Sequence, residues 1–256
     1  MTGWVSILGL GPGADSLIAP EAIHVIAEAT DVVGYIPYVR RITARDGLTL
    51  HESDNRVELD RAGHALDMAL AGKRVAVVSS GDPGVFAMAS AVFEAVENGK
   101  PEWRDLDIAV VPGITACLAA SAAAGAPLGH DFCTINLSDN LKPAALIEKR
   151  IRLAAQGDFA MAFYNPRSKA RPEGFQRALN VLRDACEPDR LVIFARAVST
   201  PEQSLKIVQL QDVVEDMADM RTVVLVGSSM TRVIERDRGP LVYTPRSAPD
   251  PDAVPV

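Results

Sequence analysis

Trp4-Val5-Ser6-Ile7-Leu8-Gly9-Leu10-Gly11-Pro12-Gly13 is the stretch that decides the fold, because a short apolar run leads directly into a glycine-rich turn. The run predicts a buried strand, and the glycines predict a turn that a second backbone can approach closely. The turn departs from the dinucleotide pattern G-x-G-x-x-G, since its third glycine comes one residue early and Pro12 has no N–H. Three interpretations remain open: a structural turn, a ligand-binding loop and a nicotinamide-dinucleotide site.

The first half of the chain continues as an alternation of strand and helix patterns. We expect strands at residues 31–34, 74–78 and 107–111, and helices at 20–29 and 57–70. A further helix after the strand at 74–78 has an apolar face from Val85 to Val96. This rhythm predicts a mainly parallel sheet with helices on both of its faces.

The second half has a different strand pattern. Strands are expected at residues 132–137, 159–163, 191–195, 205–210 and 222–226. The connection at 199–202 is too short for a helical crossover, so the strands on either side of it should pair antiparallel. The sequence therefore predicts two α/β domains, an N-terminal one with a mainly parallel sheet (residues 1–115) and a C-terminal one with a mixed sheet (116–236). Residues 237–256 are expected to form a loose tail.

Composition excludes several classes of protein. Of the 256 residues, 48% are hydrophobic and 23% are charged, and the net charge of −7 disfavours general binding to nucleic acid or to an anionic membrane. The three cysteines form no C-x-x-C pair and the four histidines are scattered, so we expect no metal site. No signal peptide or apolar run of membrane-spanning length is seen, and a cytoplasmic location is expected.

Two further turns follow predicted strands. In the first, residues 79–86, Asp82 and Pro83 suit the start of a helix, while Gly81 and Gly84 would allow a ligand to approach. The second, residues 111–116, is either a domain hinge or a ligand turn. If the strands at 74–78 and 107–111 are neighbours, both turns face one crevice at the carboxyl edge of the sheet.

Polar residues also follow strands in the second half, at 136–139, 163–168 and 195–197. Basic residues gather in two places, and each cluster is either solvated surface or a site for carboxylates. The clusters are Arg40, Arg41 and Arg45, and Arg167, Lys169 and Arg171. The chain has no G-x-S-x-G, G-x-x-x-x-G-K-[ST] or H-E-x-x-H motif.

The ordered set of Gly9–Gly13, Ser80–Pro83, Val111–Ala116 and Thr222–Gly227 resembles the tetrapyrrole methylases, the class III S-adenosylmethionine methyltransferases. The resemblance covers roughly residues 3–235. Within that family, the segments at 33–38, 136–141, 147–150 and 162–168 look like the precorrin-3B carbon-17 methyltransferases.

The resemblance implies methyl transfer from S-adenosylmethionine to carbon 17 of precorrin-3B, with ring contraction, in cobalamin biosynthesis. It implies S-adenosylhomocysteine as the other product, and a homodimer of two-domain chains with a cleft between the domains. The residues implied at the cofactor are Pro12, Ser80, Gly81, Asp82, Val85, Phe86, Thr115, Ala116, Tyr164, Asn165 and Ala197. Those implied at the tetrapyrrole substrate are Gly11, Gly13, Tyr35, Ser138 and Arg167.

The chain departs from the family at two positions. Ala197 stands where the family often has Asn, which leaves a backbone contact there, and Ile36 stands where the uroporphyrinogen methylases have an acid. No catalytic base is assigned, although Asp15, Asp139 and Glu148 are polar candidates. A metal-free substrate is favoured over a cobalt-bound one.

Three rival functions remain open at this point. The nearest is a methylase of the same family that acts at a different ring carbon or on a cobalt-bound precursor such as cobalt-precorrin-3. The others are a nicotinamide-dependent oxidoreductase and a tetrapyrrole carrier without catalytic activity.

Overall fold

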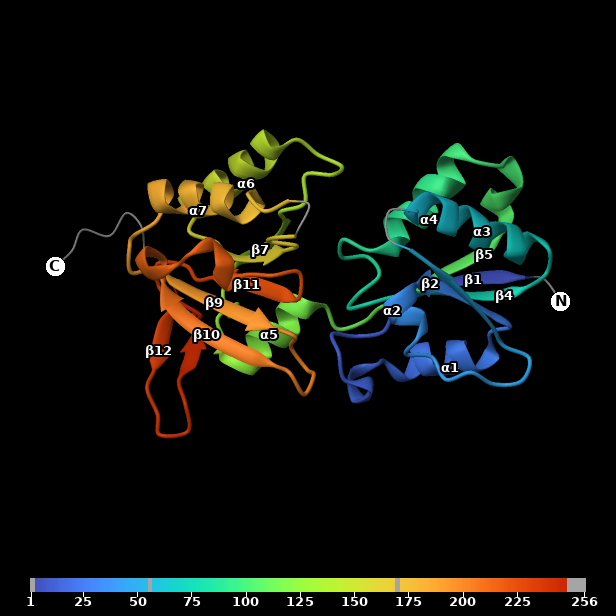
Figure 1. Ribbon diagram of the computed structural model, residues 1–256, viewed down its shortest axis with the longest axis horizontal. Helices are drawn as coiled ribbons and strands as arrows, with labels where there is room; N and C mark the ends of the chain where they lie inside the picture. The colour runs from blue at the N-terminus through green and yellow to red at the C-terminus, as the bar shows by residue number, and fades with distance from the viewer. Residues whose placement is uncertain (1–2, 55–56, 169–170, 248–256) are drawn as a thin grey trace. The chain divides into compact units, whose positions relative to one another are not determined.

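The computed structural model describes residues 3–54, 57–168 and 171–247 (Figure 1). The chain divides into two units, the first ending at Ala116 and the second beginning at Cys117. Each unit is built around its own five-stranded sheet, and the second also has a small three-stranded sheet.

The sheet of the first unit is entirely parallel, which confirms the parallel sheet expected there. Its strand order is β3-β2-β4-β1-β5, and every neighbouring pair runs in the same direction. The strands are β1 (Trp4–Gly9), β2 (Asp31–Tyr35), β3 (Thr49–Ser53), β4 (Arg74–Ser79) and β5 (Asp107–Val111).

Helices cover both faces of this sheet because alternate strand residues are buried on opposite sides. Val5 and Ile7 of β1 belong to the core under α3 and α4, whereas Leu8 belongs to the core under α1 and α2. Figure 1 shows α3 and α4 on one side of the sheet and α1 on the other. The helices are α1 (Pro20–Glu28), α2 (Ile36–Val39), α3 (Glu58–Leu70) and α4 (Met88–Asn98), with short 3-10 turns η1 (Asp15–Leu17) and η2 (Pro101–Asp105).

The expectation that β4 and β5 are neighbours is wrong, because β1 lies between them. The connection that carries α4 therefore crosses over β1. The connection from β1 to β2 leaves β1 toward the opposite edge and carries α1 on the other face. A sheet whose connections diverge in this way opens a crevice at the carboxyl ends of its strands, where ligands of α/β proteins bind.

The sheet of the second unit is mixed, as expected. Its order is β10-β9-β11-β8-β7, in which β7 and β8 are parallel and the other pairs are antiparallel. The predicted antiparallel pairing on either side of residues 199–202 is confirmed. The strands are β7 (Phe132–Asn136), β8 (Ala160–Tyr164), β9 (Leu191–Arg196), β10 (Ser204–Gln209) and β11 (Thr222–Val226).

Two helices that run in the same direction pack on one face of this sheet, because each connects two parallel strands (Figure 1). The apolar stripe of α6 (Ala144–Gln156) meets that of α7 (Gly174–Ala185), and Phe175 packs edge-to-face on Phe194 of β9. The unit begins with α5 (Ala116–Ala124), and 3-10 turns η3 (Leu210–Asp212) and η4 (Glu215–Met217) precede β11.

The prediction of a loose tail from residue 237 is wrong for its first part. β13 (Leu241–Tyr243) pairs with β12 (Arg232–Ile234) and also lies parallel to β6 (Gly125–Ala126). Val242 is fully buried, and the Thr244 hydroxyl donates to the Pro127 carbonyl at 2.6 Å. Three consecutive pairing residues are enough to anchor the segment, although the tail has few apolar residues besides them. Residues 248–256 lie outside the described residues.

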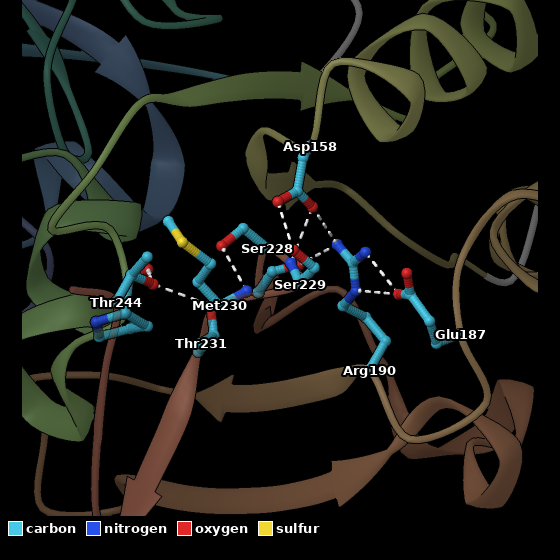
Figure 2. Close-up of polar contacts among 10 residues, drawn as sticks. Asp158, Glu187, Arg190, Ser228, Ser229, Met230, Thr231 and Thr244 are labelled. Carbon is cyan, nitrogen blue, oxygen red and sulfur yellow. Dashed lines mark hydrogen bonds and ion pairs between the residues drawn. The ribbon is translucent and has the colours of Figure 1, made fainter. Parts of the chain in front are cut away.

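A polar network joins the starts of β8 and β9 to the end of β11 (Figure 2). The buried guanidinium of Arg190 lies 3.1 Å from Asp158 and 2.6 Å from Glu187, and it also donates to the Gly227 carbonyl at 3.0 Å. Asp158 in turn accepts from the backbone and the hydroxyl of Ser229, at 2.7 and 2.6 Å. The network fixes the loop that leaves β11 on the way to the small sheet.

Candidate functional site

Three turns meet at the carboxyl edge of the first sheet, following β1, β4 and β5. The turn after β1 is joined to the turn after β4 by a two-residue bridge. Gly81 donates to the Gly11 carbonyl at 2.8 Å, and Gly11 donates to the Gly81 carbonyl at 3.2 Å. Gly11 and Gly81 both have positive φ, at 66° and 65°, which explains why glycine occupies both places.

Gly113 of the third turn packs against the other two. A Cβ placed on Gly9 would lie 2.5 Å from the Gly81 carbonyl oxygen and 2.8 Å from the Gly113 Cα. A Cβ on Gly113 would lie 2.9 Å from the Gly9 Cα and would also overlap the Gly81 carbonyl. The three backbones are therefore in direct contact, and the end of β1 is the place where the turns after β4 and β5 meet.

Asp82 links two of these turns through its carboxylate. Its Oδ1 accepts from the Gly84 backbone N–H at 2.8 Å, and its Oδ2 accepts from the Gly113 backbone N–H at 3.0 Å. The expectation that Asp82 and Pro83 begin a helix is wrong, since α4 begins at Met88. Pairing with Gly113 holds Asp82 away from a helix terminus, and the positive φ of Phe86, 55°, breaks a helix before Met88.

The cofactor residues expected in the first unit all lie on these three turns. Gly81 and Thr115 are buried, whereas the Phe86 side chain is 46% exposed. The others, Pro12, Ser80, Asp82, Val85 and Ala116, are half-buried. A non-glycine residue with positive φ is uncommon, and such strained positions gather at functional sites. Phe86 combines that conformation with an exposed aromatic ring.

A mostly apolar groove of about 430 Å³ adjoins the same turns. It is lined by Ser16–Pro20 on one side and by Pro112, Gly113 and Ile114 on the other. Gly113 therefore belongs both to the glycine contact and to the wall of the groove.

In the second unit, polar groups cluster at the carboxyl ends of β7 and β8. The Asn136 side-chain oxygen accepts from the Ser138 backbone at 2.9 Å and from the Asn165 side chain at 3.1 Å. Asn165 has a positive φ of 51°. The Tyr164 hydroxyl accepts from the Cys117 backbone N–H at 2.9 Å. The structure thus brings Tyr164, Asn165 and Ser138 to one edge, as their positions after strands predicted.

Ala197 follows β9 with a positive φ of 50° and is buried. Its N–H donates to the Arg221 carbonyl at 2.9 Å, and its carbonyl accepts from the Thr200 hydroxyl at 2.8 Å. Both backbone groups of Ala197 therefore have protein partners.

The basic clusters behave differently from each other. Arg40 pairs with Glu52 at 3.2 Å, Arg41 pairs with Asp15 at 3.1 Å, and Arg45 donates to three carbonyls at the end of α1. Arg167 has only a long contact, 3.9 Å, with Glu215, and its buried Nε has no hydrogen-bond partner among the described residues. Lys169 lies outside the described residues.

The three candidate bases are all ion-paired. Asp15 lies against Arg41, while Asp139 and Glu148 share Arg177 at 2.8 and 3.9 Å. The structure gives no support to any of the three as the base.

Sequence reasoning missed a buried arginine behind the turn after β4. Arg61 of α3 is 5% exposed and donates to the Ser53 hydroxyl at 2.7 Å, the Asp54 carbonyl at 2.6 Å and the Met88 sulfur at 3.3 Å. Burial lowers the pKa of Arg61. The sequence did not indicate that Arg61 is buried, because an arginine on the exposed face of a helix can occur at the same spacing from the apolar residues.

Tyr35 and Tyr38 form an edge-to-face pair with ring centroids 5.4 Å apart, at the end of β2. Burial raises the pKa of Tyr38, and the nearby Tyr35 adds to the rise, while Arg61 and Arg41 oppose it. Both hydroxyls belong to the segment 33–38 that the sequence singled out, although only Tyr35 was assigned to the substrate.

Within the described ranges, no three His, Cys, Asp or Glu side chains are grouped closely enough to bind a metal ion. Over the same ranges, every helix is too short or too polar to cross a bilayer.

A family model described as Tetrapyrrole (Corrin/Porphyrin) Methylases matches residues 5–214. The chain belongs to the tetrapyrrole methylase family. It is 48% identical to a precorrin-3B C(17)-methyltransferase from Sinorhizobium sp, over 96% of this chain and 97% of that protein.

Solved structures of other tetrapyrrole methylases have the same fold. A crystal structure of the methyltransferase CobJ matches with a TM-score of 0.92 and 66% identity, and covers 95% of this chain and all of that one. A uroporphyrin-III C-methyltransferase from Thermus thermophilus, complexed with S-adenosylhomocysteine, matches in fold with a TM-score of 0.67 and 22% identity. That alignment covers 88% of this chain and 92% of the other.

Proposed function

We propose that the chain transfers a methyl group from S-adenosylmethionine to carbon 17 of precorrin-3B, with contraction of the macrocycle, in cobalamin biosynthesis. The observation that carries the proposal is the 48% identity, over nearly the whole of both chains, to a protein named for that reaction. The interlocked turns after β1, β4 and β5 support it, because the predicted cofactor residues of the first unit lie together on them, at the carboxyl edge of one sheet.

The residues of these turns fit S-adenosylmethionine better than a nicotinamide dinucleotide. The turns at 9–13, 79–86 and 111–116 contain no Lys or Arg, and Pro12 offers no N–H. Asp82 adds a negative charge that would repel a pyrophosphate. S-Adenosylmethionine has no phosphate, and its sulfonium is positively charged. Turns that contain a carboxylate and no Lys or Arg therefore suit it.

In this proposal the turns of the first unit, with Tyr164, Asn165 and Ala197 of the second, hold the cofactor. When bound, S-adenosylmethionine supplies an electrophilic methyl group. The protein then contributes mainly alignment, which is a large rate factor when two reactants are held in an attacking geometry. The backbone of a glycine-rich turn suits this task, because the turn has few side chains that could move and displace the bound reactants.

We also propose that Gly11, Gly13, Tyr35, Ser138 and Arg167 contact the tetrapyrrole. Arg167 has the best support, since its buried Nε has no partner within the described part of the chain and its only ion-pair contact is long. A carboxylate side chain of the substrate would give this guanidinium a charge-assisted hydrogen bond. No residue is proposed as the base for ring contraction.

Replacing Arg167 by Ala tests the substrate assignment. We expect KM for precorrin-3B to rise about 10- to 150-fold, since a hydrogen bond to a charged group is worth roughly 1.5–3 kcal/mol, while KM for S-adenosylmethionine stays unchanged. Arg152→Ala, which removes an exposed arginine paired with Asp184 at 3.6 Å, is the matched control. An unchanged KM for precorrin-3B in Arg167→Ala would remove Arg167 from the substrate site.

Calorimetry separates the proposal from the nicotinamide and carrier alternatives. We expect S-adenosylhomocysteine to bind and NADH not to bind. Incubation with methyl-labelled S-adenosylmethionine and precorrin-3B should transfer label, whereas a tetrapyrrole carrier would bind the substrate without methyl transfer. Product mass distinguishes a metal-free from a cobalt-bound substrate. The homodimer, the cleft between the domains and the cytoplasmic location remain predictions, and sedimentation analysis tests the first.

A further inference from the structure

We propose that Asp82 is a positioning residue that fixes the turn after β5 for the cofactor, acting through Gly113 and not through contact with the ligand. The proposal rests on the proposed function only in naming S-adenosylmethionine as the ligand. It changes the role implied by the family resemblance, which placed Asp82 among the cofactor contacts.

The hydrogen bonds of the carboxylate carry the first step of the argument. One oxygen accepts from Gly84, two residues along its own turn, and the other accepts from Gly113, 31 residues away. The first bond closes a local turn of the kind that Asp and Asn side chains form with their own backbone. The second bond is long-range and joins the turns that follow β4 and β5.

The chemistry of the two donors explains why this residue is a carboxylate. Both partners are backbone N–H groups, so both side-chain oxygens must be acceptors. Asn could accept from Gly84 but would then direct its own NH₂ at the Gly113 N–H. Only an ionised Asp satisfies both donors, and hydrogen bonds to an ionised group are stronger than neutral ones.

The location of Gly113 shows what this bond controls. Gly113 touches Gly9 and the Gly81 carbonyl so closely that it has no room for a side chain. It also lies two residues before Thr115, whose Cα is 3.5 Å from the Cβ position of Gly81. Loss of the Asp82 bond would therefore let the turn after β5 move against the other two turns. Small displacements of this kind can cost large factors in rate.

Asp82→Asn is the informative variant, because its single amide oxygen can accept from only one of the two N–H groups, and the local bond to Gly84 is the one we expect it to keep. The exposed Asp105→Asn serves as the matched control. In ligand-free protein, we expect hydrogen exchange of the Gly113 amide, followed by mass spectrometry on a peptide spanning 111–117, to accelerate at least about tenfold in Asp82→Asn only. Unchanged exchange would overturn the proposal.

Ligand truncation separates positioning from direct contact. We expect Asp82→Asn to weaken S-adenosylhomocysteine and 5′-methylthioadenosine by the same factor of about ten, since both depend on the turn. Selective weakening of S-adenosylhomocysteine alone would mean that Asp82 contacts the amino-acid part of the ligand, which overturns the proposal. If the wild type binds neither compound, the proposed function fails, while the exchange result still decides the role of Asp82 in the turn.

A measurement on the wild-type protein covers the case in which Asp82→Asn does not fold. As pH is lowered, the amide proton resonances of Gly84 and Gly113 should shift together in ligand-free protein, because both report on one carboxylate. A Gly113 resonance that does not follow that of Gly84 would overturn the proposal.

Discussion

The Tyr164 hydroxyl at the end of β8 lies 2.9 Å from the Cys117 backbone nitrogen and accepts a hydrogen bond from it. Cys117 is in the first turn of α5, where backbone N–H groups have no partner within the helix. A side chain from a distant strand thus accepts from one of the N–H groups in the first turn of α5. Burial raises the pKa of the Cys117 thiol, which keeps it protonated beside this cap.

Tyr164→Phe should therefore destabilise the protein by about 1 kcal/mol, the usual value of one hydrogen bond or helix cap. Urea unfolding measures the change. Tyr243→Phe is the control, since the Tyr243 hydroxyl makes no hydrogen bond to a residue that the structure describes. Equal stability of Tyr164→Phe and the wild type would contradict the capping role.

Gly113→Ala should lower the free energy of unfolding by about 1–3 kcal/mol and weaken S-adenosylhomocysteine, because a methyl group there overlaps the backbones of Gly9 and Gly81. Gly63→Ala is the contrasting variant. A Cβ on Gly63 would meet only Trp103, at 3.4 Å, and a helical Gly→Ala change favours the helix by about 0.5–1 kcal/mol. Thermal unfolding of the two variants should shift in opposite directions, and a tolerated Gly113→Ala would refute the close contact.

Arg190→Met should destabilise the second unit by roughly 2–4 kcal/mol, because the buried guanidinium joins Asp158, Glu187 and the Gly227 carbonyl (Figure 2). The range extends down to about 2 kcal/mol because Asp158 and Glu187 are partly exposed, so water can solvate their carboxylates once the guanidinium is removed. Arg152→Met removes an exposed pair and should change stability by less than about 1 kcal/mol. Similar unfolding midpoints for the two variants would argue against the network.

Asp31 makes the stability of the first unit dependent on pH. Burial alone would raise the pKa of Asp31, but hydrogen bonds from His51 and Thr30 and the charge of Lys73 outweigh burial, so the pKa is lowered. A lowered pKa in the folded state stabilises the protein above the unfolded-state pKa of about 3.9, and this contribution disappears as pH falls through the folded value.

Asp31→Asn removes that titration. The stability difference between wild type and Asp31→Asn should therefore be constant near neutral pH and should shrink below about pH 4. Urea unfolding at a series of pH values measures it, with Asp105→Asn as an exposed control. A difference that persists unchanged to pH 3 would contradict the account.

Most strands of the two large sheets were predictable because each is a short apolar run, and the parallel sheet followed from the alternation with helices. The edge strand β3 (Thr49–Ser53) was missed, because its sequence is mostly polar. The strand order was not predictable, because β1 separates β4 from β5 through pairing across 70 residues or more. Asp82 shows the same limit within the site. Its local sequence matches the start of a helix. The carboxylate instead accepts from the N–H of Gly113, which is distant in the sequence.

The sequence predicted the parts of the candidate site that consist of glycines and of polar residues at the ends of strands. Arg61 was missed because burial, which distinguishes it from a surface arginine, is not encoded in helical spacing. Val242 was underestimated because its partner, Gly125, lies more than 100 residues away.

The position of the new methyl group tests the central claim most directly. The protein is incubated with precorrin-3B and S-adenosylmethionine carrying a ¹³C-labelled methyl group, and the product is examined by NMR. We predict a single labelled methyl group, attached to carbon 17 of a ring-contracted macrocycle. Label on another ring carbon, or no transfer of label from a protein that binds both compounds, would contradict the account.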